Sequence, residues 1–251
     1  MLIAVYLALM VIGVIGIFVC RSKQKTNPNA QSVAVIFTIV TLVGAGGLIY
    51  DQFAGGDREM DQIMKNEASY AKARSLMIAE YAGKNWAGQT AVIIVEPNTE
   101  KNQINKACLD ALKEGLKKAN ISATEEVLDI QQGTGEDSIP IESAINAKIY
   151  NDIFNKNKNA NIFFLLSQLP LDAKEKNKMK CWEFNPKKTR LVLVLNEVED
   201  LKSLQPIIAK GLIGAAVITK SGFDPEKPAA KDWKEAFDSR YELLTPESVK
   251  K

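Results

Sequence analysis

The sequence opens with two apolar runs, LIAVYLALMVIGVIGIFVC at residues 2–20 and SVAVIFTIVTLVGAGGLIY at residues 32–50. Neither run contains Asp, Glu, Lys or Arg. A helix rises about 1.5 Å per residue, so each run reaches roughly 28 Å, the thickness of a bilayer's hydrocarbon core. We therefore predict a transmembrane hairpin over residues 1–50. The alternatives are a buried helix of a soluble core and, for the first run, a cleaved signal peptide, although this run lacks a basic start and a small-residue cleavage site.

The loop between the two runs indicates an orientation. It carries Arg21, Lys23 and Lys25 and no acid, so the positive-inside rule places it in the cytoplasm. In a bacterium this predicts a multi-pass protein of the inner (plasma) membrane with an extracytoplasmic, periplasmic C-terminal domain. Arg58 and Lys65, beyond the second run, leave the opposite orientation open. Glycines recur in both runs and favour close helix packing: Gly13, Gly16, Gly44, Gly46 and Gly47.

The composition excludes several classes of function. The 251 residues include 32 Lys and Arg, 30 Asp and Glu, and no His. The chain after the apolar runs is almost neutral, which gives no reason to expect a nucleic-acid partner. The absence of His excludes Ser-His-Asp and Cys-His catalysis and His-ligated metals, so we predict no cofactor and no metal. A disulfide between Cys108 and Cys181 stays open, because nothing in their spacing requires it.

Residues 51–88 are predicted to form a hinge and a helical stalk between the hairpin and the C-terminal domain. Gly55-Gly56 marks the hinge, and the stalk helix runs from Arg58 to Gly83. Its apolar residues mostly recur at three or four positions, but Glu67 and Arg74 interrupt the stripe. We expect the stalk to pack against the domain or a partner helix rather than form a coiled coil.

Residues 89–251 alternate short apolar runs with amphipathic segments, which predicts a doubly wound, mostly parallel sheet of about five to six strands with a flavodoxin-like or Rossmann-like arrangement. The predicted strands are 90–95, 126–130, 162–166, 191–195 and 215–219, with an edge strand at 240–244. The predicted helices are 102–119, 140–157, one from about residue 205, and 230–237.

The passage from Ala91–Glu96 through Asn98 into an amphipathic helix resembles a single lobe of a type I periplasmic solute-binding protein. The resemblance covers roughly Gln89–Ser221. It implies an α/β fold of this kind. The second lobe that such proteins close around a ligand has no counterpart in the resemblance.

Ligands of open α/β sheets bind beyond the carboxyl ends of the strands, where the strand order reverses. The polar residues at the predicted strand ends therefore form a candidate ligand pocket. The alternative is that they are ordinary loop and helix-cap residues, as Asn98 would be. The candidate residues are Glu96, Asn98, Ser167, Gln168, Asn196, Glu197, Lys220 and Ser221.

Chemistry without His has few candidates here. Glu96 and Glu197 could act as a carboxylate pair, and Ser167 and Lys220 as a nucleophilic dyad. Residues 133–137, GTGED, lack the GxGxxG and Walker lysine patterns and carry acids that repel phosphate, so no nucleotide site is predicted.

The segment 170–189 is unusually long for a connection and rich in lysine. It is predicted to dock on a protein partner or an anionic lipid surface, and the alternative is that its aromatic residues fold back onto the sheet. The candidate partner-binding residues are Lys174, Lys176, Lys178, Lys180, Trp182, Phe184, Lys187 and Lys188.

These observations favour a non-enzymatic interaction or assembly subunit of a membrane complex. One alternative is an extracytoplasmic module that binds or senses a small solute. A second alternative is a His-free hydrolase or transferase, which requires the candidate residues to converge in a cleft.

Overall fold

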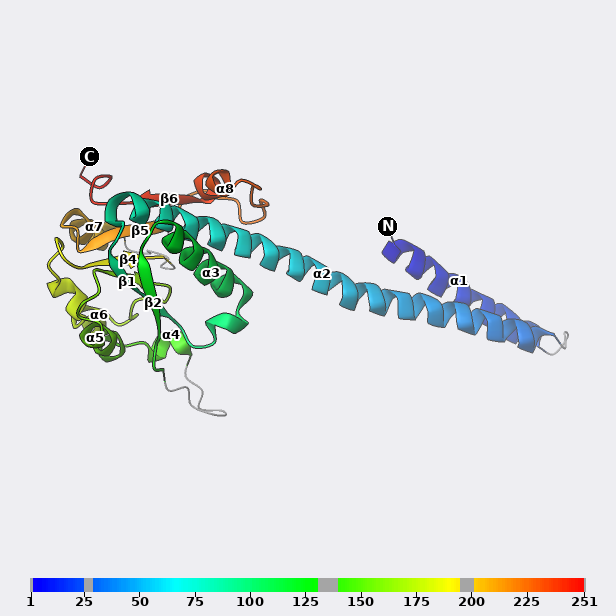
Figure 1. The fold of residues 1–251 in the computed structure, drawn as a ribbon. Coiled ribbons are helices and arrows are strands. Elements are labelled where there is room, and N and C mark those ends of the chain that lie inside the picture. Colours follow the sequence, from blue (N-terminus) through cyan, green and yellow to red (C-terminus); the bar gives the residue numbers. More distant parts are fainter. Residues whose placement is uncertain (1, 25–28, 131–139, 195–200, 251) are drawn as a thin grey trace. The chain divides into compact units, whose positions relative to one another are not determined.

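The computed structural model describes residues 2–24, 29–130, 140–194 and 201–250. Contacts between Cα atoms divide the chain into two compact units, Met1–Ile63 and Met64–Lys251, which we call the anchor unit and the head unit. The chain starts with α1 (Leu2–Lys23) and continues into α2 (Ala30–Trp86), which contributes residues to both units (Figure 1).

The anchor unit contains two stretches, Ala4–Lys23 and Ala30–Tyr50, that are long and apolar enough to cross a membrane. Glycines bring their backbones close together, as the sequence predicts. A Cβ atom built on Gly13 would lie 2.9 Å from the Phe37 carbonyl oxygen, and one built on Gly44 would lie 2.9 Å from the Tyr6 carbonyl oxygen. No larger side chain fits at these two positions without a shift of backbone.

The helix break expected at Gly55-Gly56 does not occur, because residues 51–59 belong to α2. Each glycine costs a helix only about 1 kcal/mol relative to Ala, which a long helix can offset. The expected domain limits, residues 1–50, 51–88 and 89–251, remain a prediction. In the head unit, α2 contributes several buried side chains: Tyr70, Ala71, Ala73, Ile78, Ala79, Ala82 and Trp86.

The head unit is built on a six-stranded sheet with the order β2-β1-β3-β4-β5-β6. The first five of these strands are mutually parallel, and β6 pairs antiparallel with β5. The order confirms the flavodoxin-like arrangement and puts the reversal of strand order between β1 and β3. The strands are β1 (Thr90–Val95), β2 (Ser122–Val127), β3 (Ile162–Leu165), β4 (Arg190–Leu193), β5 (Ile213–Thr219) and β6 (Tyr241–Leu244).

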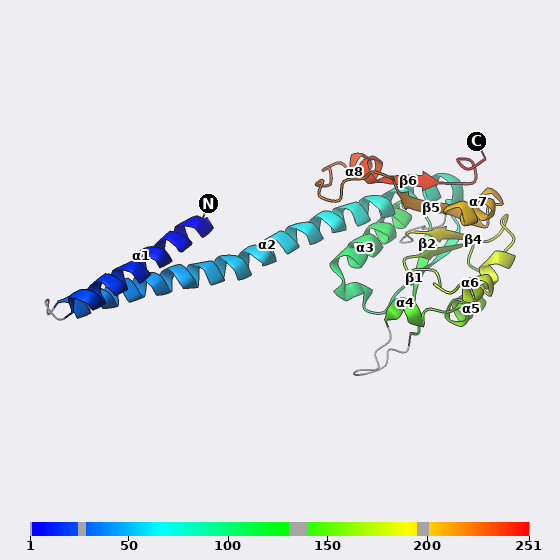
Figure 2. The same ribbon diagram turned by 180° about the vertical axis from the view of Figure 1, so that it is seen from behind.

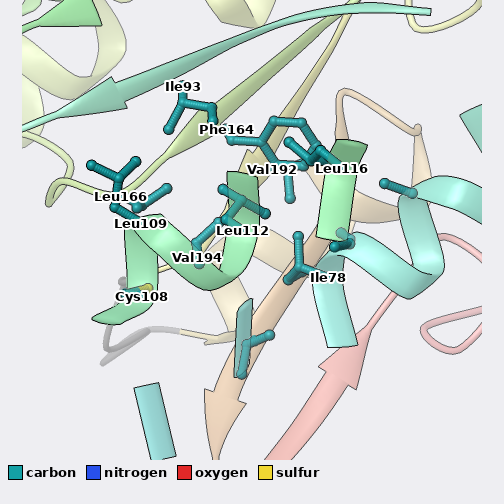
Figure 3. Close-up of a cluster of buried hydrophobic side chains, with 14 of the residues drawn as sticks. Ile78, Ile93, Cys108, Leu109, Leu112, Leu116, Phe164, Leu166, Val192 and Val194 are labelled. Carbon is teal, nitrogen blue, oxygen red and sulfur yellow. The ribbon is translucent and has the colours of Figure 1, made fainter. Parts of the chain in front are cut away.

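Helices cover both faces of the sheet (Figures 1 and 2). One face packs against α2, α3 (Gln103–Lys118) and α8 (Trp233–Arg240). Figure 3 shows part of this cluster, with Ile78 of α2 and Leu112 of α3 near Phe164 of β3. The other face packs against α5 (Ala147–Lys156) and α7 (Leu201–Ala209). The shorter helices are η1 (Thr99–Lys101), α4 (Ile141–Ala144), α6 (Ala173–Asn177) and η2 (Lys180–Glu183).

Two predicted elements differ from the structure. The strand expected at 126–130 is β2, Ser122–Val127, whose residues are polar because it is an exposed edge strand. The helix expected at 140–157 is broken into α4 and α5, because the Asn146 side chain accepts the Ile149 N–H and caps a new helix.

The disulfide between Cys108 and Cys181 does not form. Both thiols are free and buried. Cys108 lies in the cluster beneath α2 and α3, whereas Cys181 lies in the cluster on the opposite face of the sheet. The sheet therefore separates the two sulfur atoms.

Candidate ligand site at the carboxyl edge of the sheet

The reversal of strand order between β1 and β3 brings Glu96 and Gln168 together. Glu96 follows β1 directly and is half-buried, and Gln168 follows β3 and is exposed. The Gln168 backbone N–H donates to Glu96 Oε1 at 3.4 Å. Adjacent strands lie about 4.8 Å apart, so these two residues lie side by side at the carboxyl edge of the sheet, the position at which open α/β sheets bind ligands. We call this place the β1/β3 site.

A tight turn follows β1 at the β1/β3 site. The Thr99 hydroxyl donates to the Glu96 carbonyl at 2.7 Å, and the Thr99 N–H donates to the same oxygen at 3.3 Å. Asn98 adopts the left-handed region, at φ 63°, and is exposed. Its side chain does not cap η1; Asn102 caps the following helix α3 instead, through the Ile104 and Asn105 N–H groups. Asn98 is therefore not needed as a helix cap.

A buried network around Tyr150, on α5, holds the chain that follows β3 at the β1/β3 site. The Tyr150 hydroxyl lies 2.7 Å from Ser167 Oγ and donates to the Gln168 carbonyl at 2.5 Å. Since Tyr150 has one proton, Ser167 donates to Tyr150. Burial, with a further contribution from the Glu96 charge, raises the pKa of Tyr150 despite the Ser167 hydrogen bond. Tyr150 thus stays protonated and holds the strand end after β3 in place.

The remaining strand-end candidates do not join this group. Lys220 follows β5, which is two strands away from β3, or about 10 Å. Its Nζ donates to the Asp238 carbonyl at 2.6 Å, at the end of α8, while Ser221 beside it is exposed. The structure therefore does not bring Ser167 and Lys220 together as a dyad. Asn196 and Glu197 lie outside the described residues, and so does the proposed pairing of Glu96 with Glu197.

The aromatic residues of the segment 170–189 pack onto the protein. Trp182 Nε1 donates to the Lys176 carbonyl at 2.6 Å, and the Phe184 ring lies 5.3 Å from that of Phe154 and 5.7 Å from that of Phe163. Both side chains contact the core on the α5 face of the sheet. This is the alternative that the sequence left open, in which the aromatics cover the sheet.

The lysines of this segment lie mostly at the surface. Lys178 pairs with Glu175 at 2.6 Å, and Lys180 Nζ donates to Asn155 Oδ1 at 3.3 Å. The side chains of Lys174, Lys187 and Lys188 are exposed, and Lys176 is half-exposed. Their docking on a partner remains a prediction.

The sequence did not indicate Tyr150. It stands within the apolar stripe of its helix, next to Ile149, and such a tyrosine is expected simply to fill the core. Only the pairing of β1 with β3 reveals that its hydroxyl meets the strand end. Among the described residues, no group of three or more His, Cys, Asp or Glu side chains could hold a metal ion.

No protein-family model matches this chain, and no curated protein matches it. Similar solved structures include GanP, a glucose-galactose binding protein from Geobacillus stearothermophilus, with a TM-score of 0.42 and 12% identity over 72% of this chain and 52% of that one. AraP, an arabinose binding protein from the same organism, has a TM-score of 0.44 and 13% identity over 72% of this chain and 62% of that one.

A periplasmic ribose ABC transporter structure from Conexibacter woesei has a TM-score of 0.44 and 10% identity over 72% of this chain and 58% of that one. The chain thus spans between half and two thirds of the length of these structures. At this identity the likeness is one of α/β fold alone.

Proposed function

We propose that this chain is a membrane-anchored module that binds or senses a small polar solute at the β1/β3 site. The observation that carries the proposal is the meeting of Glu96 and Gln168 where the strand order reverses. The membrane anchor is supported by two apolar stretches that are long enough to span a bilayer. An extracytoplasmic location of the head unit is part of the same proposal.

The residues of the β1/β3 site suggest which class of solute could bind. Glu96 offers a half-buried carboxylate, which accepts hydrogen bonds, while the exposed amides of Asn98 and Gln168 can both donate and accept. A carboxylate with two amides suits a ligand with several hydroxyl groups or with an ammonium group. It disfavours anions such as phosphate.

The sequence alone favoured an assembly subunit of a membrane complex. That preference rested on the long stalk, the absence of His and the lack of a catalytic or nucleotide motif, and the basic segment with its aromatic residues was the candidate docking surface. Because Trp182 and Phe184 pack against the core, the aromatic anchors of that surface are already used within the head unit. A His-free enzyme is less well supported still, since Ser167 is buried and bonded to Tyr150.

The test is thermal unfolding of the full-length protein in mild detergent, with a panel of monosaccharides, polyols, amino acids and polyamines. The panel includes glucose, galactose and arabinose. A ligand at about a hundred times its Kd stabilises the native state by roughly 2.7 kcal/mol, which raises Tm by about 5 to 10 °C for a domain of this size.

Two variants locate the binding site. Glu96→Gln and Gln168→Ala should each abolish most of the shift in Tm. Glu114→Gln is the matched control, because Glu114 lies on the exposed side of α3, where it pairs with Lys118. A ligand that stabilises all four proteins equally would place its site elsewhere, and a panel without any effect would count against the proposal.

A further inference from the structure

The strands at the two edges of the sheet differ in how far their residues are exposed to solvent. β6 forms one edge, and its first and last residues, Tyr241 and Leu244, are buried. β2 forms the other edge and has five exposed residues and one half-exposed residue, Glu126. An exposed edge strand is a template for pairing with another strand, which proteins normally prevent or use.

The hydrogen bonds of β2 show which backbone groups face the open edge. The Ser122 N–H donates to the Gln89 carbonyl at 3.3 Å, and the Leu128 N–H donates to the Val95 carbonyl at 2.9 Å. Successive residues of a strand direct their backbone groups to opposite sides, so the even-numbered residues of β2 face β1. The N–H and C=O groups of residues 123, 125 and 127 therefore point to the open edge.

The side chains of β2 divide between the two faces of the sheet. Glu125 pairs with Lys113 of α3, so Ala123, Glu125 and Val127 lie on the α3 face. Glu126 pairs with Lys156 of α5 at 2.8 Å, which puts Ser122, Thr124 and Glu126 on the α5 face. Val127 is 53% exposed and offers apolar surface at the end of the strand.

The two ends of β2 are complementary to each other. A hollow of about 600 Å³ runs along the start of the strand and is lined by Lys113, Lys117, Ile121 and Ala123. Glu125 and Val127 lie on the same face at the other end. One end thus offers Lys117 beside apolar surface, and the other offers an exposed valine and Glu125, whose carboxylate already pairs with Lys113 of the same chain.

We propose that a second copy of this chain pairs with β2 in antiparallel orientation, with Thr124 on the twofold axis. Two copies related in this way face each other through the same patch. Ala123 then stands opposite Glu125 of the other copy, which brings that carboxylate near Lys117. Val127 stands opposite Ile121, over the apolar part of the hollow. The sheet becomes continuous across both copies.

A twofold axis at residue 124 is preferred to one at residue 125 for a physical reason. Ala123 and Glu125 are residues whose backbone groups face the open edge, so they can exchange two hydrogen bonds across the axis. A shift of the axis to residue 125 would place two glutamates directly opposite each other, which is destabilising. A six-residue strand pair is small, so the dimer is expected to depend on the high local concentration of copies in a membrane.

Cysteine cross-linking in membranes tests the proposal on the full-length protein. Opposite residues that do not share hydrogen bonds lie about 4.5 Å apart at Cα, within the range of about 4.4 to 6.8 Å that a disulfide requires. Thr124→Cys should therefore give a disulfide-linked dimer on mild oxidation. Ser122→Cys is the control on the same exposed face, because its two copies would lie four residues out of register, or about 13 Å apart. The native Cys20, Cys108 and Cys181 are all buried.

A second pair of variants tests the register without altering the backbone. Ala123→Glu places two carboxylates opposite each other and should lower the cross-linking of Thr124→Cys roughly three- to tenfold, whereas Ala123→Lys should maintain or raise it. Circular dichroism confirms that each variant is folded. Equal cross-linking at residues 122 and 124, no cross-linking at residue 124, or equal effects of Glu and Lys at residue 123 would each overturn the proposal.

Discussion

The two ends of α2 are both helical, but they differ in composition and in the burial of their side chains. Residues 30–50 are apolar on all sides, and their larger side chains point outward, as Ile36 at 59% and Leu42 at 65% exposure show. Residues 64–86 mix charged and apolar residues and bury Tyr70, Ile78 and Trp86 completely or almost so. The first segment is long and apolar enough to cross a membrane, whereas the second is itself part of a core.

Both segments use small residues where another helix approaches. In the anchor unit, Gly44 and Gly47 meet Tyr6 and Met10 of α1. In the head unit, a Cβ atom built on Gly83 would lie 2.8 Å from that of Ala119, on the loop after α3. The difference is what would surround the contact: in a bilayer the lipid is as apolar as the helices themselves, so packing alone would hold the first pair, whereas the second pair also gains from excluding water.

The largest effect is expected from removing the second segment. A fragment of residues 89–251 should fail to fold, whereas a fragment of residues 64–251 should unfold cooperatively. The loss of the buried Tyr70, Ile78 and Trp86 side chains alone costs roughly 5 to 9 kcal/mol, which is comparable to the whole stability of a domain. Thermal unfolding followed by circular dichroism separates the two outcomes. A cooperative transition in the fragment of residues 89–251 would show that the folded domain begins at residue 89, as the sequence predicts.

A smaller effect is expected from the ion pair that joins the second segment to the end of α8. Arg240 donates to both carboxylate oxygens of Glu67, at 2.7 and 2.8 Å, and its side chain is only 15% exposed. Its guanidinium also lies over the rings of Phe223 and Tyr70, at 4.2 and 4.7 Å from their centroids. Arg240→Met should therefore lower the free energy of unfolding by about 2 to 3 kcal/mol in urea.

Two controls show whether the ion pair itself is responsible. Lys118→Met removes an exposed pair with Glu114 on α3 and should cost less than about 0.5 kcal/mol. In a double-mutant cycle, Arg240→Met in the Glu67→Gln background should cost less than in the native protein. An equal cost in both backgrounds would assign the effect to ring packing alone.

This ion pair also explains why the sequence described the second segment incompletely. Glu67 and Arg74 interrupt its apolar stripe, so the sequence predicted a stalk packed against the domain or a partner helix and did not show how deeply its residues are buried. In the structure Glu67 binds Arg240, and the Arg74 guanidinium lies 5.5 Å from the centre of the Tyr241 ring. Periodicity cannot identify such buried charges, because their partners lie more than 160 residues away in the chain.

The strands show the same limit. β1, β3, β4 and β5 were predicted because parallel strands that are buried on both faces are continuously apolar. The predicted residue range of β2 was wrong because its SATEEV sequence is that of an exposed edge strand. The apolar Leu128 next to it shifted the predicted strand to later residues. For the candidate site, strand ends predicted Glu96 and Gln168, but the hydroxyl of Tyr150 depends on a contact between elements that no local pattern reveals.

The smallest effect is expected in the first segment, where neighbouring glycines differ in their surroundings. Gly47 faces the Tyr6 ring, whereas a Cβ atom on Gly46 would meet nothing within 4 Å. Gly47→Ile should therefore separate the two apolar helices, with a cost of roughly 1 to 3 kcal/mol, while Gly46→Ile should be tolerated. Spin labels at Leu7→Cys and Ile49→Cys, both on exposed positions, report the separation as a longer distance in lipid nanodiscs. If both glycine variants gave the native distance, the contact at Tyr6 would not hold the helices together.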